Sequence, residues 1–155
     1  MIAEIDKKPI SIDQFLDWYP ESSQNGYELR RGVVVEMPKP RGKHSEIAGF
    51  LIKCLNSVID NMQVPYFIPR ECIVKISNNT GYEPDVTVIK RPNLGNEPHW
   101  EKASVIENGE SVALTVEVVS TNWRDDYGLK MTDYESIGID AVSYTHLRAH
   151  ETQSD

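Results

Sequence analysis

The sequence predicts a mixed α/β fold in which helices flank a central sheet and a β-hairpin precedes that sheet. Three observations support this class. An amphipathic helical pattern runs from about residue 47 to 62, two short valine-rich runs later in the chain are typical of strands, and the earlier segment "GYELRRGVVVEM" has the composition of a hairpin. At 155 residues the chain suits one domain with a substantial core, and no internal repeat is visible.

Composition and charge narrow the class of protein. Hydrophobic residues make up 39% of the chain and charged residues 26%, which is ordinary for a soluble globular protein. No run approaches the roughly 18 apolar residues of a membrane helix, and the N-terminus lacks a signal-peptide pattern, so we expect a cytoplasmic protein without a membrane partner. The net charge of −8 argues against a protein that coats nucleic acid broadly, because phosphate neutralisation needs basic residues. Cys54 and Cys72 lie in apolar patterns and are expected in the core rather than in a disulfide or a metal site.

The N-terminal part predicts a short helix followed by the hairpin. Ser11 and Gln14 form a capping-box pattern in front of apolar residues, and Pro20 follows the end of the helix. The hairpin pairs residues 27–30 with residues 33–37 around an Arg-Gly turn.

The longest predicted helix has an apolar face of about four turns. Its apolar residues recur at steps of three and four: Ile47, Phe50, Leu51, Cys54, Leu55, Val58, Ile59 and Met62. Such a face must pack on something broad, and we expect a sheet there. Pro65 ends the connection to the next element.

The second half of the chain predicts the strands of the sheet. "YFIPRECIVKI" (66–76) is expected to be one strand, bulged or at an edge near its proline, and is followed by the turn "SNNTG". "PDVTVIK" (84–90) predicts another strand, and residues 91–110 a polar loop. "SVALTVEVVS" (111–120) is the most apolar run and is therefore expected to be central.

Two carboxylates stand within these strand patterns. Asp85 lies at the start of "PDVTVIK", and Glu117 lies inside "LTVEVV". A buried, unpaired carboxylate is costly or stays protonated, so Glu117 either faces solvent or meets a positive charge. If the two strands are neighbours, both acids converge on one point, where a magnesium ion would satisfy them. Otherwise Asp85 is an ordinary carboxylate at a strand start and Glu117 an ordinary solvated one.

The last predicted helix, residues 124–137, ends at Gly138 and carries Lys130. If this helix returns over the sheet, the Lys130 ammonium lies beside the two acids and can stabilise developing negative charge. Otherwise Lys130 is a surface lysine. Glu28 in the hairpin and His44 at the start of the long helix are secondary candidates, for which a cross-strand ion pair and a solvated position are the simpler accounts.

Taken in chain order, these residues resemble the Uma-type family of putative restriction endonucleases, within the PD-(D/E)XK nuclease superfamily. The similarity covers roughly residues 10–140. "PD" alone is a weak signal, but the ordered set is more specific: Glu28, His44, Pro84–Asp85, Glu117, Ser120, Lys130 and Tyr134. The resemblance implies a restriction-endonuclease-like sheet flanked by helices.

The resemblance also implies a metal-dependent phosphodiesterase that acts on DNA. Asp85 matches the acid of "PD" and Glu117 the acid of "(D/E)XK". With the backbone carbonyl of Val118 they are the implied ligands of Mg²⁺, with Mn²⁺ as the alternative ion. The lysine position of the superfamily motif is occupied by Val119, and in the Uma-type family the following helix supplies this lysine, a position that Lys130 matches.

Two further expectations come from the same resemblance. Glu28 and His44 match recurrent positions of the family, and we count them as catalytic candidates beside Asp85, Glu117 and Lys130. Many nucleases of this kind act as dimers, so a homodimer is expected as well, although no residue pattern fixes its interface.

The C-terminal residues depart from the family pattern. The family continues past "GI" with an aromatic-rich strand of the form "EYWLVDP", whereas this chain reads "DAVSYTHLRAHETQSD". "VSYTHLRAHET" resembles one reading frame of a common sequencing-library adaptor. We therefore expect an endonuclease-like domain over residues 1–141, incomplete at its C-terminus, and a non-native tail over residues 142–155 whose histidines are not metal ligands. "AVSYTHL" is strand-compatible and can occupy the place of the missing strand.

Three hypotheses remain from the sequence. The leading one is a magnesium-dependent endonuclease that hydrolyses phosphodiester bonds in DNA, with the basic run Lys39–His44 either contacting phosphate or forming a solvated loop. The second is a catalytically inactive module on the same fold that binds nucleic acid or protein. The third is a truncated chain that does not fold stably.

Overall fold

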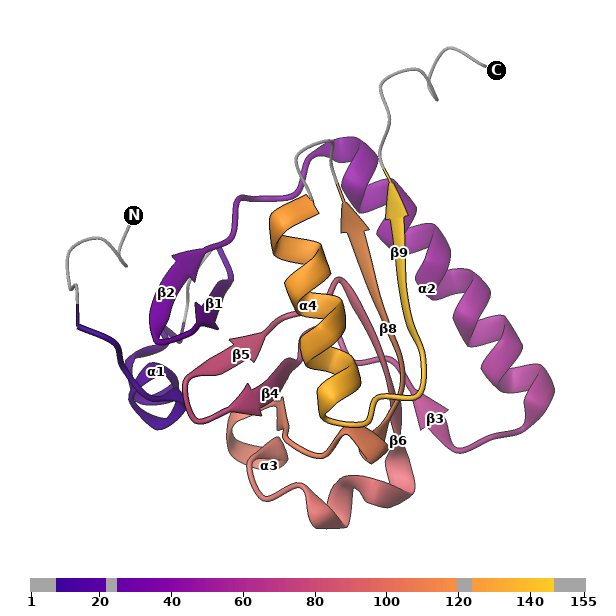
Figure 1. Cartoon of the computed structure of the whole chain (residues 1–155). Coiled ribbons are helices and arrows are strands. Elements are labelled where there is room, and N and C mark those ends of the chain that lie inside the picture. Colours follow the sequence, from indigo (N-terminus) through magenta and orange to yellow (C-terminus); the bar gives the residue numbers. More distant parts are fainter. Residues whose placement is uncertain (1–7, 22–24, 120–123, 147–155) are drawn as a thin grey trace.

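The computed structural model describes residues 8–21, 25–119 and 124–146 (Figure 1). Its helices are α1 (Ile12–Trp18), α2 (Gly42–Met62), α3 (Trp100–Ala103) and α4 (Arg124–Ser136), with the 3-10 segments η2 (Arg91–Asn96) and η3 (Gly109–Ser111). Its strands are β1 (Tyr27–Arg30), β2 (Val33–Glu36), β3 (Tyr66–Phe67), β4 (Ile73–Ser77), β5 (Thr80–Tyr82), β6 (Val86–Lys90), β7 (Val105–Ile106), β8 (Val112–Val119) and β9 (Val142–His146).

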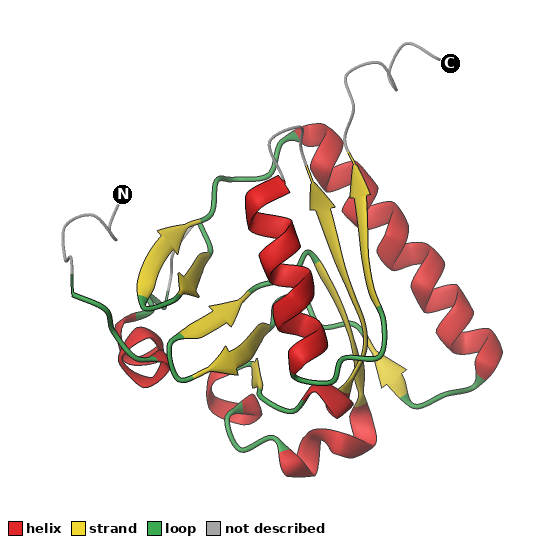
Figure 2. Ribbon diagram, viewed as in Figure 1, coloured by secondary structure: helices red, strands yellow, loops and turns green. Residues whose placement is uncertain are grey.

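The strands form two sheets, with helices packed around them (Figure 2). The first sheet has the order β2-β1-β5-β4-β7 and the second the order β3-β6-β8-β9. The mixed α/β class and the hairpin are therefore confirmed, but the hairpin is part of the first sheet. The expected single strand over residues 66–76 is also divided, because the run containing Pro69 interrupts it and sends β3 and β4 to different sheets.

The register of the second sheet brings the two predicted acids to facing positions. β6 and β8 are antiparallel, and Val86 lies opposite Val116. Asp85 directly precedes β6, so the same register places it opposite Glu117, with both side chains on one face of the sheet. β8 lies between β6 and β9, which confirms that the most apolar run is central.

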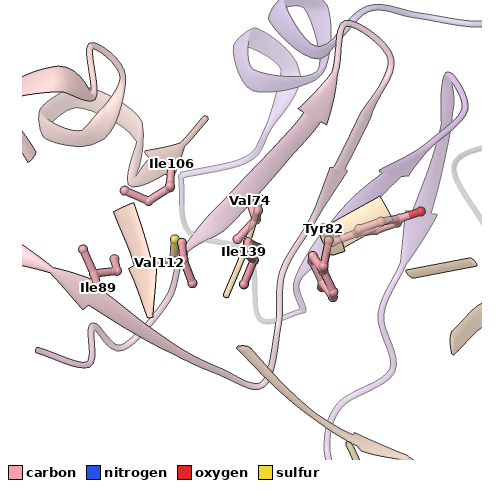
Figure 3. Packing of buried hydrophobic residues seen from close by; sticks show 8 residues of the cluster. Val74, Tyr82, Ile89, Ile106, Val112 and Ile139 are labelled. Atoms are coloured by element: carbon pink, nitrogen blue, oxygen red, sulfur yellow. The ribbon is translucent and has the colours of Figure 1, made fainter. Parts of the chain in front are cut away.

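The larger core cluster fills the space between the two sheets. Figure 3 shows buried side chains from the first sheet facing others from the second, together with one residue that follows α4: Val74, Tyr82, Ile89, Ile106, Val112 and Ile139. A smaller cluster packs α1 against the hairpin and includes Phe15, Leu29 and Val105. The two sheets are thus held together chiefly by apolar contacts, which fixes the position of β1 relative to β8.

Local sequence signals account for the N-terminal elements. The Ser11 hydroxyl accepts a hydrogen bond from the Gln14 amide at 3.1 Å, and the Gln14 side chain accepts one from the Ser11 amide at 2.9 Å, which confirms the capping box. In the hairpin turn Arg31 and Gly32 have φ values of 51° and 84°. This left-handed pair matches the right-handed twist of the flanking strands.

The segment expected to be a loop, residues 91–110, is ordered by apolar side chains that enter the cores and by one buried carboxylate. Glu97 accepts hydrogen bonds from the amides of Glu107 and Asn108 and, at 2.6 Å, from the hydroxyl of Ser111. The segment therefore contains η2, α3, β7 and the start of η3. The polar composition of the segment concealed these short elements because its few apolar side chains, such as Val105 and Ile106, are too widely spaced to form a periodic pattern, although they are buried in the core.

The long helix α2 departs from expectation in its packing. Its bounds confirm the predicted helix, but none of its residues is buried, so the expected broad cover by a sheet is only partial. Cys54 on this helix is exposed, and its assignment to the core is wrong, whereas Cys72 is buried as expected and both thiols are free. In the part of the chain that the structure describes, no helix combines the length and apolar character needed to cross a membrane.

Residues 142–146, which the sequence assigns to an adaptor-like tail, form β9. This strand pairs in parallel with β8, with Tyr144 opposite Glu117, and none of its residues is fully buried. Strand-compatible residues thus occupy the place beside the central strand. The division into a domain over residues 1–141 and a non-native tail stays a prediction, and residues 147–155 lie outside the described part of the chain.

Candidate functional site

Side chains from both sheets and two helices meet at one ionic cluster, which is buried at Glu28, Glu117 and Lys130 and half-buried at His44 and Asp85. Its members are the five residues singled out in the sequence: Glu28 on β1, His44 in the first turn of α2, Asp85 before β6, Glu117 on β8 and Lys130 on α4. Direct contacts join Lys130 to Glu28 and Glu117, and His44 to Asp85, while the register of β6 and β8 places Asp85 opposite Glu117. Residues that span more than 100 positions of the chain are therefore gathered at the junction of the two sheets.

The Lys130 ammonium lies between two buried carboxylates. Its Nζ is 2.9 Å from Glu28 Oε2 and 3.6 Å from Glu117 Oε2. Lys130 is 2% exposed, Glu28 0% and Glu117 4%. The solvent-facing alternative for Glu117 and the surface alternative for Lys130 are thereby excluded. A charged residue inside a valine-rich strand is explained by this cation.

Glu28 is held by several donors at once. Its Oε1 accepts hydrogen bonds from Arg30 Nε at 3.2 Å and Nη2 at 3.0 Å, and its Oε2 accepts one from the Glu83 amide at 3.0 Å in addition to the Lys130 ammonium. A fully buried carboxylate with this number of donors has little freedom to move. Glu28 is therefore placed to fix the position of Lys130.

His44 and Asp85 form a second pair in the cluster. His44 Nε2 is 2.8 Å from Asp85 Oδ1, and the Val118 amide donates to Asp85 Oδ2 at 2.7 Å. The hydrogen bond to Asp85 raises the pKa of His44, against a smaller opposing effect of burial. The first turn of α2 thus faces the carboxylates, and the solvated alternative for His44 is excluded.

Tyr134 supports Glu117 from the other side. Its hydroxyl donates a hydrogen bond to Glu117 Oε2 at 2.6 Å. Burial raises the pKa of Glu117 to about 7, the carboxylates of Glu28 and Asp85 add to this effect, and the ammonium of Lys130 and the Tyr134 hydroxyl oppose it. Glu117 therefore carries its negative charge only with difficulty in this environment.

Sequence reasoning gave no role to two members of this network. Tyr134 lies four residues after Lys130, so both side chains project from the same face of α4, and this spacing is the signal that could have paired them. Arg30 lies two residues after Glu28 on one face of β1, a period-2 relation that predicts neighbouring side chains. Ser120, which belongs to the family-like set, lies outside the described residues.

A second polar network fixes α4 against the hairpin turn. Arg31 Nη2 is 2.9 Å from Asp133 Oδ1, and the Tyr82 hydroxyl donates to Asp133 Oδ2 at 2.5 Å. Asp133 is adjacent to Tyr134 on α4. The orientation of this helix, and with it the position of Lys130, is therefore determined by contacts on two of its turns.

The donor set suits a hard divalent cation. Among the described residues no group of three or more His, Cys, Asp or Glu side chains is arranged to hold a metal ion by itself. Magnesium, however, is commonly held by one or two carboxylates and completes its shell with waters. Asp85 and Glu117 offer two such carboxylates on one face, and since burial raises the pKa of Glu117 to about 7, a cation beside this carboxylate would favour its charged form. A cation therefore fits the chemistry of these residues.

A comparison with models of protein families gives a match over most of the chain. The sequence profile of Uma2, described as a putative restriction endonuclease, matches residues 12–144, which is most of the chain. A comparison with curated proteins gives no match.

Proposed function

The chain belongs to the Uma2 family of putative restriction endonucleases, and from this premise we propose that it is a metal-dependent endonuclease that hydrolyses phosphodiester bonds in DNA. The observation that supports the proposal most directly is the environment of Glu117. This carboxylate is buried on the central strand, faces Asp85, and meets the ammonium of Lys130 at 3.6 Å. Two acids and a buried amine at one point are costly for stability alone, which favours a chemical role.

The carboxylates of Asp85 and Glu117 and the backbone carbonyl of Val118 would hold Mg²⁺, with Mn²⁺ as the alternative ion. An ion bound there supplies Lewis acidity toward a phosphate oxygen and lowers the pKa of a bound water. Tyr134 keeps the Glu117 carboxylate oriented through its 2.6 Å hydrogen bond, and His44 does the same for Asp85 at 2.8 Å.

Lys130 acts in this proposal as a fixed positive charge. Its Nζ lies 2.9 Å from Glu28 and 3.6 Å from Glu117, so the side chain is placed to stabilise negative charge on a phosphate that approaches Glu117. Glu28, which Arg30 and the Glu83 amide hold in place, is the positioning residue for this ammonium. The catalytic assignment of Glu28 thus becomes a proposal about position.

The start of α2 offers a local path for the DNA backbone. Lys39, Arg41 and Lys43 are exposed, and His44 in the same turn touches Asp85. Basic side chains and free amides at a helix N-terminus favour phosphate. Since the chain carries a net charge of −8, contact with DNA is expected to stay local, with a shallow dependence of affinity on salt.

Cleavage of supercoiled plasmid with MgCl₂ tests the proposal. We expect nicked or linear product from the wild type, none in EDTA, and loss of cleavage in Asp85→Asn, Glu117→Gln and Lys130→Met. Asp140→Asn, at an aspartate whose side chain is 70% exposed, is the matched control and should cleave normally. Calorimetric titration with Mn²⁺ gives a readout without DNA, in which Asp85→Asn should abolish binding. Full cleavage by both acid variants would refute the assignment.

A binding module without catalysis is the second candidate. It is favoured by the engagement of both Asp85 oxygens and of Glu117 Oε2 by donors of the protein itself. This candidate predicts that labelled DNA binds equally well in EDTA and in MgCl₂ and is never cut. Metal-dependent cleavage that the Asp85→Asn variant lacks would exclude it.

A further inference from the structure

Tyr127 is an aromatic residue of α4 at the edge of the ionic cluster. Figure 1 shows α4 lying over strands of both sheets, and this helix contacts β4 of the first sheet and β9 of the second. Tyr127 comes three residues before Lys130 and seven before Tyr134, so the three side chains share one face of α4. The Lys130 ammonium lies over the Tyr127 ring, with Nζ 5.4 Å from its centroid, and over the Tyr82 ring at 5.1 Å. Two aromatic faces therefore border the ammonium.

The hydroxyl groups of these tyrosines differ in their partners. The Tyr82 hydroxyl donates to Asp133, and the Tyr134 hydroxyl donates to Glu117. The Tyr127 hydroxyl makes no hydrogen bond to any residue in the part of the chain that the structure describes, and its side chain is only half-buried. A hydroxyl in this situation is left to water or to a ligand. Tyr127 therefore offers a donor that the fold itself does not use.

The surroundings of Tyr127 keep this hydroxyl in its donor form. Burial raises the pKa of Tyr127. Three carboxylates raise it further, in the order Glu117, Asp85 and Glu28, and the guanidinium of a nearby arginine opposes them. At neutral pH the phenol is therefore protonated and uncharged. Lys130 Nζ lies 3.6 Å from Glu117 and 5.4 Å from the Tyr127 ring, so a group that approaches this ammonium also approaches both side chains.

Access to the cluster is open on the side of its half-buried residues. Tyr82 and Tyr134 are 1% and 0% exposed and close the inner side. The side chains of His44 and Asp85 are 23% and 24% exposed, and Tyr127 is half-buried as well. A ligand therefore reaches the ammonium past the half-buried side chains and not past the fully buried ones.

A phosphodiester group on this path presents non-bridging oxygens, which share a negative charge and accept hydrogen bonds. A neutral phenol donates to such an oxygen without adding charge to the site. We propose that Tyr127 binds the DNA substrate by donating a hydrogen bond from its hydroxyl to a non-bridging oxygen of the phosphate beside Lys130. This contact rests on the proposed function, which supplies a DNA phosphate as the ligand. The ring has a separate part, because it lies over the ammonium and supports its position.

The substitution Tyr127→Phe separates the hydroxyl from the ring. Phenylalanine keeps the aromatic face over Lys130 and removes only the donor. In plasmid cleavage with MgCl₂ we expect KM to rise at least about tenfold and kcat to change less than about twofold, because the hydrogen bond forms in the bound substrate as well as in the transition state. The melting temperature should not change. Tyr66→Phe is the matched control, since Tyr66 is half-buried and lies opposite Lys90, at the far end of β6 from Asp85.

Binding of DNA tests the contact without cleavage. In a Glu117→Gln background, which the proposed function makes inactive, fluorescence anisotropy of a short labelled duplex gives the dissociation constant in MgCl₂. Tyr127→Phe should raise this constant at least about tenfold. The slope of its logarithm against the logarithm of salt concentration should stay the same, because a neutral phenol releases no counterions. Tyr66→Phe in the same background should bind as tightly as the parent.

The outcomes separate this contact from the proposed function. Equal duplex affinity of the Tyr127→Phe protein and its parent would overturn the contact, whether or not the wild type cleaves. A wild type that never cleaves, with duplex affinity that still depends on the Tyr127 hydroxyl, would refute the endonuclease function and keep the contact. If only Tyr127→Leu, which also removes the ring, impairs binding and cleavage, the side chain acts solely on the position of Lys130 and the proposal fails.

Discussion

Replacement of Lys130 by methionine tests the central contact of the buried cluster. Methionine keeps a long apolar side chain but removes the ammonium from between Glu28 and Glu117. At an effective dielectric constant of ~20, Coulomb's law gives about 6 kcal/mol for the 2.9 Å contact to Glu28 and about 5 kcal/mol for the 3.6 Å contact to Glu117. Desolvation of the lysine in the wild type offsets much of this attraction, so we expect a net loss of about 3–5 kcal/mol in the free energy of unfolding.

The loss should depend on pH in a defined direction. Burial and the neighbouring carboxylates raise the pKa of Glu117 from 4.5 to about 7, and Lys130 opposes this rise, so the variant should have a still higher value. A folded-state pKa above the unfolded value means that stability is lost as pH rises between the two values. Because the folded-state pKa of Glu117 is higher in the variant, the variant loses more stability than the wild type as pH rises. The difference between wild type and Lys130→Met should therefore be larger at pH 8 than at pH 5.

Urea titration followed by tryptophan fluorescence measures both effects. Lys102→Met, at an exposed lysine of α3, is the matched control and should change the free energy of unfolding by less than about 0.5 kcal/mol. Lys130→Met leaves the Glu28 carboxylate without its lysine partner, and the double variant Glu28→Gln/Lys130→Met removes this charge as well. Part of the lost stability should therefore return in the double variant. A Lys130→Met variant within about 1 kcal/mol of wild type at pH 8 would refute the view that the ammonium is buried and paired.

Three other substitutions probe neighbouring features. Tyr134→Phe removes the hydroxyl that donates to Glu117 and should cost about 1–2 kcal/mol in urea titration, so an unchanged midpoint would contradict the 2.6 Å hydrogen bond. Burial, followed by the carboxylates of two nearby glutamates, raises the pKa of Glu83 to about 7. Glu83→Gln should therefore stabilise the protein by about 1–3 kcal/mol at pH 8, but not at pH 4, where the wild-type carboxyl is protonated. Equal stability of the variant and the wild type at pH 8 would contradict this reasoning. In Gly109→Ala the new Cβ would overlap the backbone that follows α4, and the substitution should lower the free energy of unfolding by about 2–4 kcal/mol. Gly95→Ala, whose Cβ meets open space, should be nearly neutral. Similar melting temperatures for the two variants would show that the backbone at Gly109 shifts to admit the methyl group.

Elements with a strong local signal were predicted well from the sequence. The capping box at Ser11 begins α1, the Arg31–Gly32 turn closes the hairpin, and the apolar period of α2 set its extent. These features depend on neighbours within a few residues, which a single sequence displays. The division into two sheets could not be predicted in this way, because it depends on which strands pair across long stretches of chain.

The members of the candidate site and the approach of Lys130 to Glu117 were anticipated from the sequence, but the contact of Lys130 with Glu28 was not. Asp85, Glu117 and Lys130 were singled out by residue type and by family resemblance, and their facing positions follow once β6 and β8 are paired. The contact between Lys130 and Glu28 spans 102 residues, and no local pattern predicts it. Cys54 was misplaced for the opposite reason: its apolar period is real, but the period alone does not say whether a partner covers that face.

The position of the cluster at the junction of the two sheets couples its assembly to folding. Glu28 comes from the five-stranded sheet and Glu117 from the four-stranded one, and the ammonium of α4 joins them. Neither sheet can assemble the cluster by itself, so a partly folded chain that has its strands but has not docked the sheets lacks the candidate site. Glu28 and Glu117 share the Lys130 ammonium only when both sheets and α4 come together, so the cluster favours docking of all three at once.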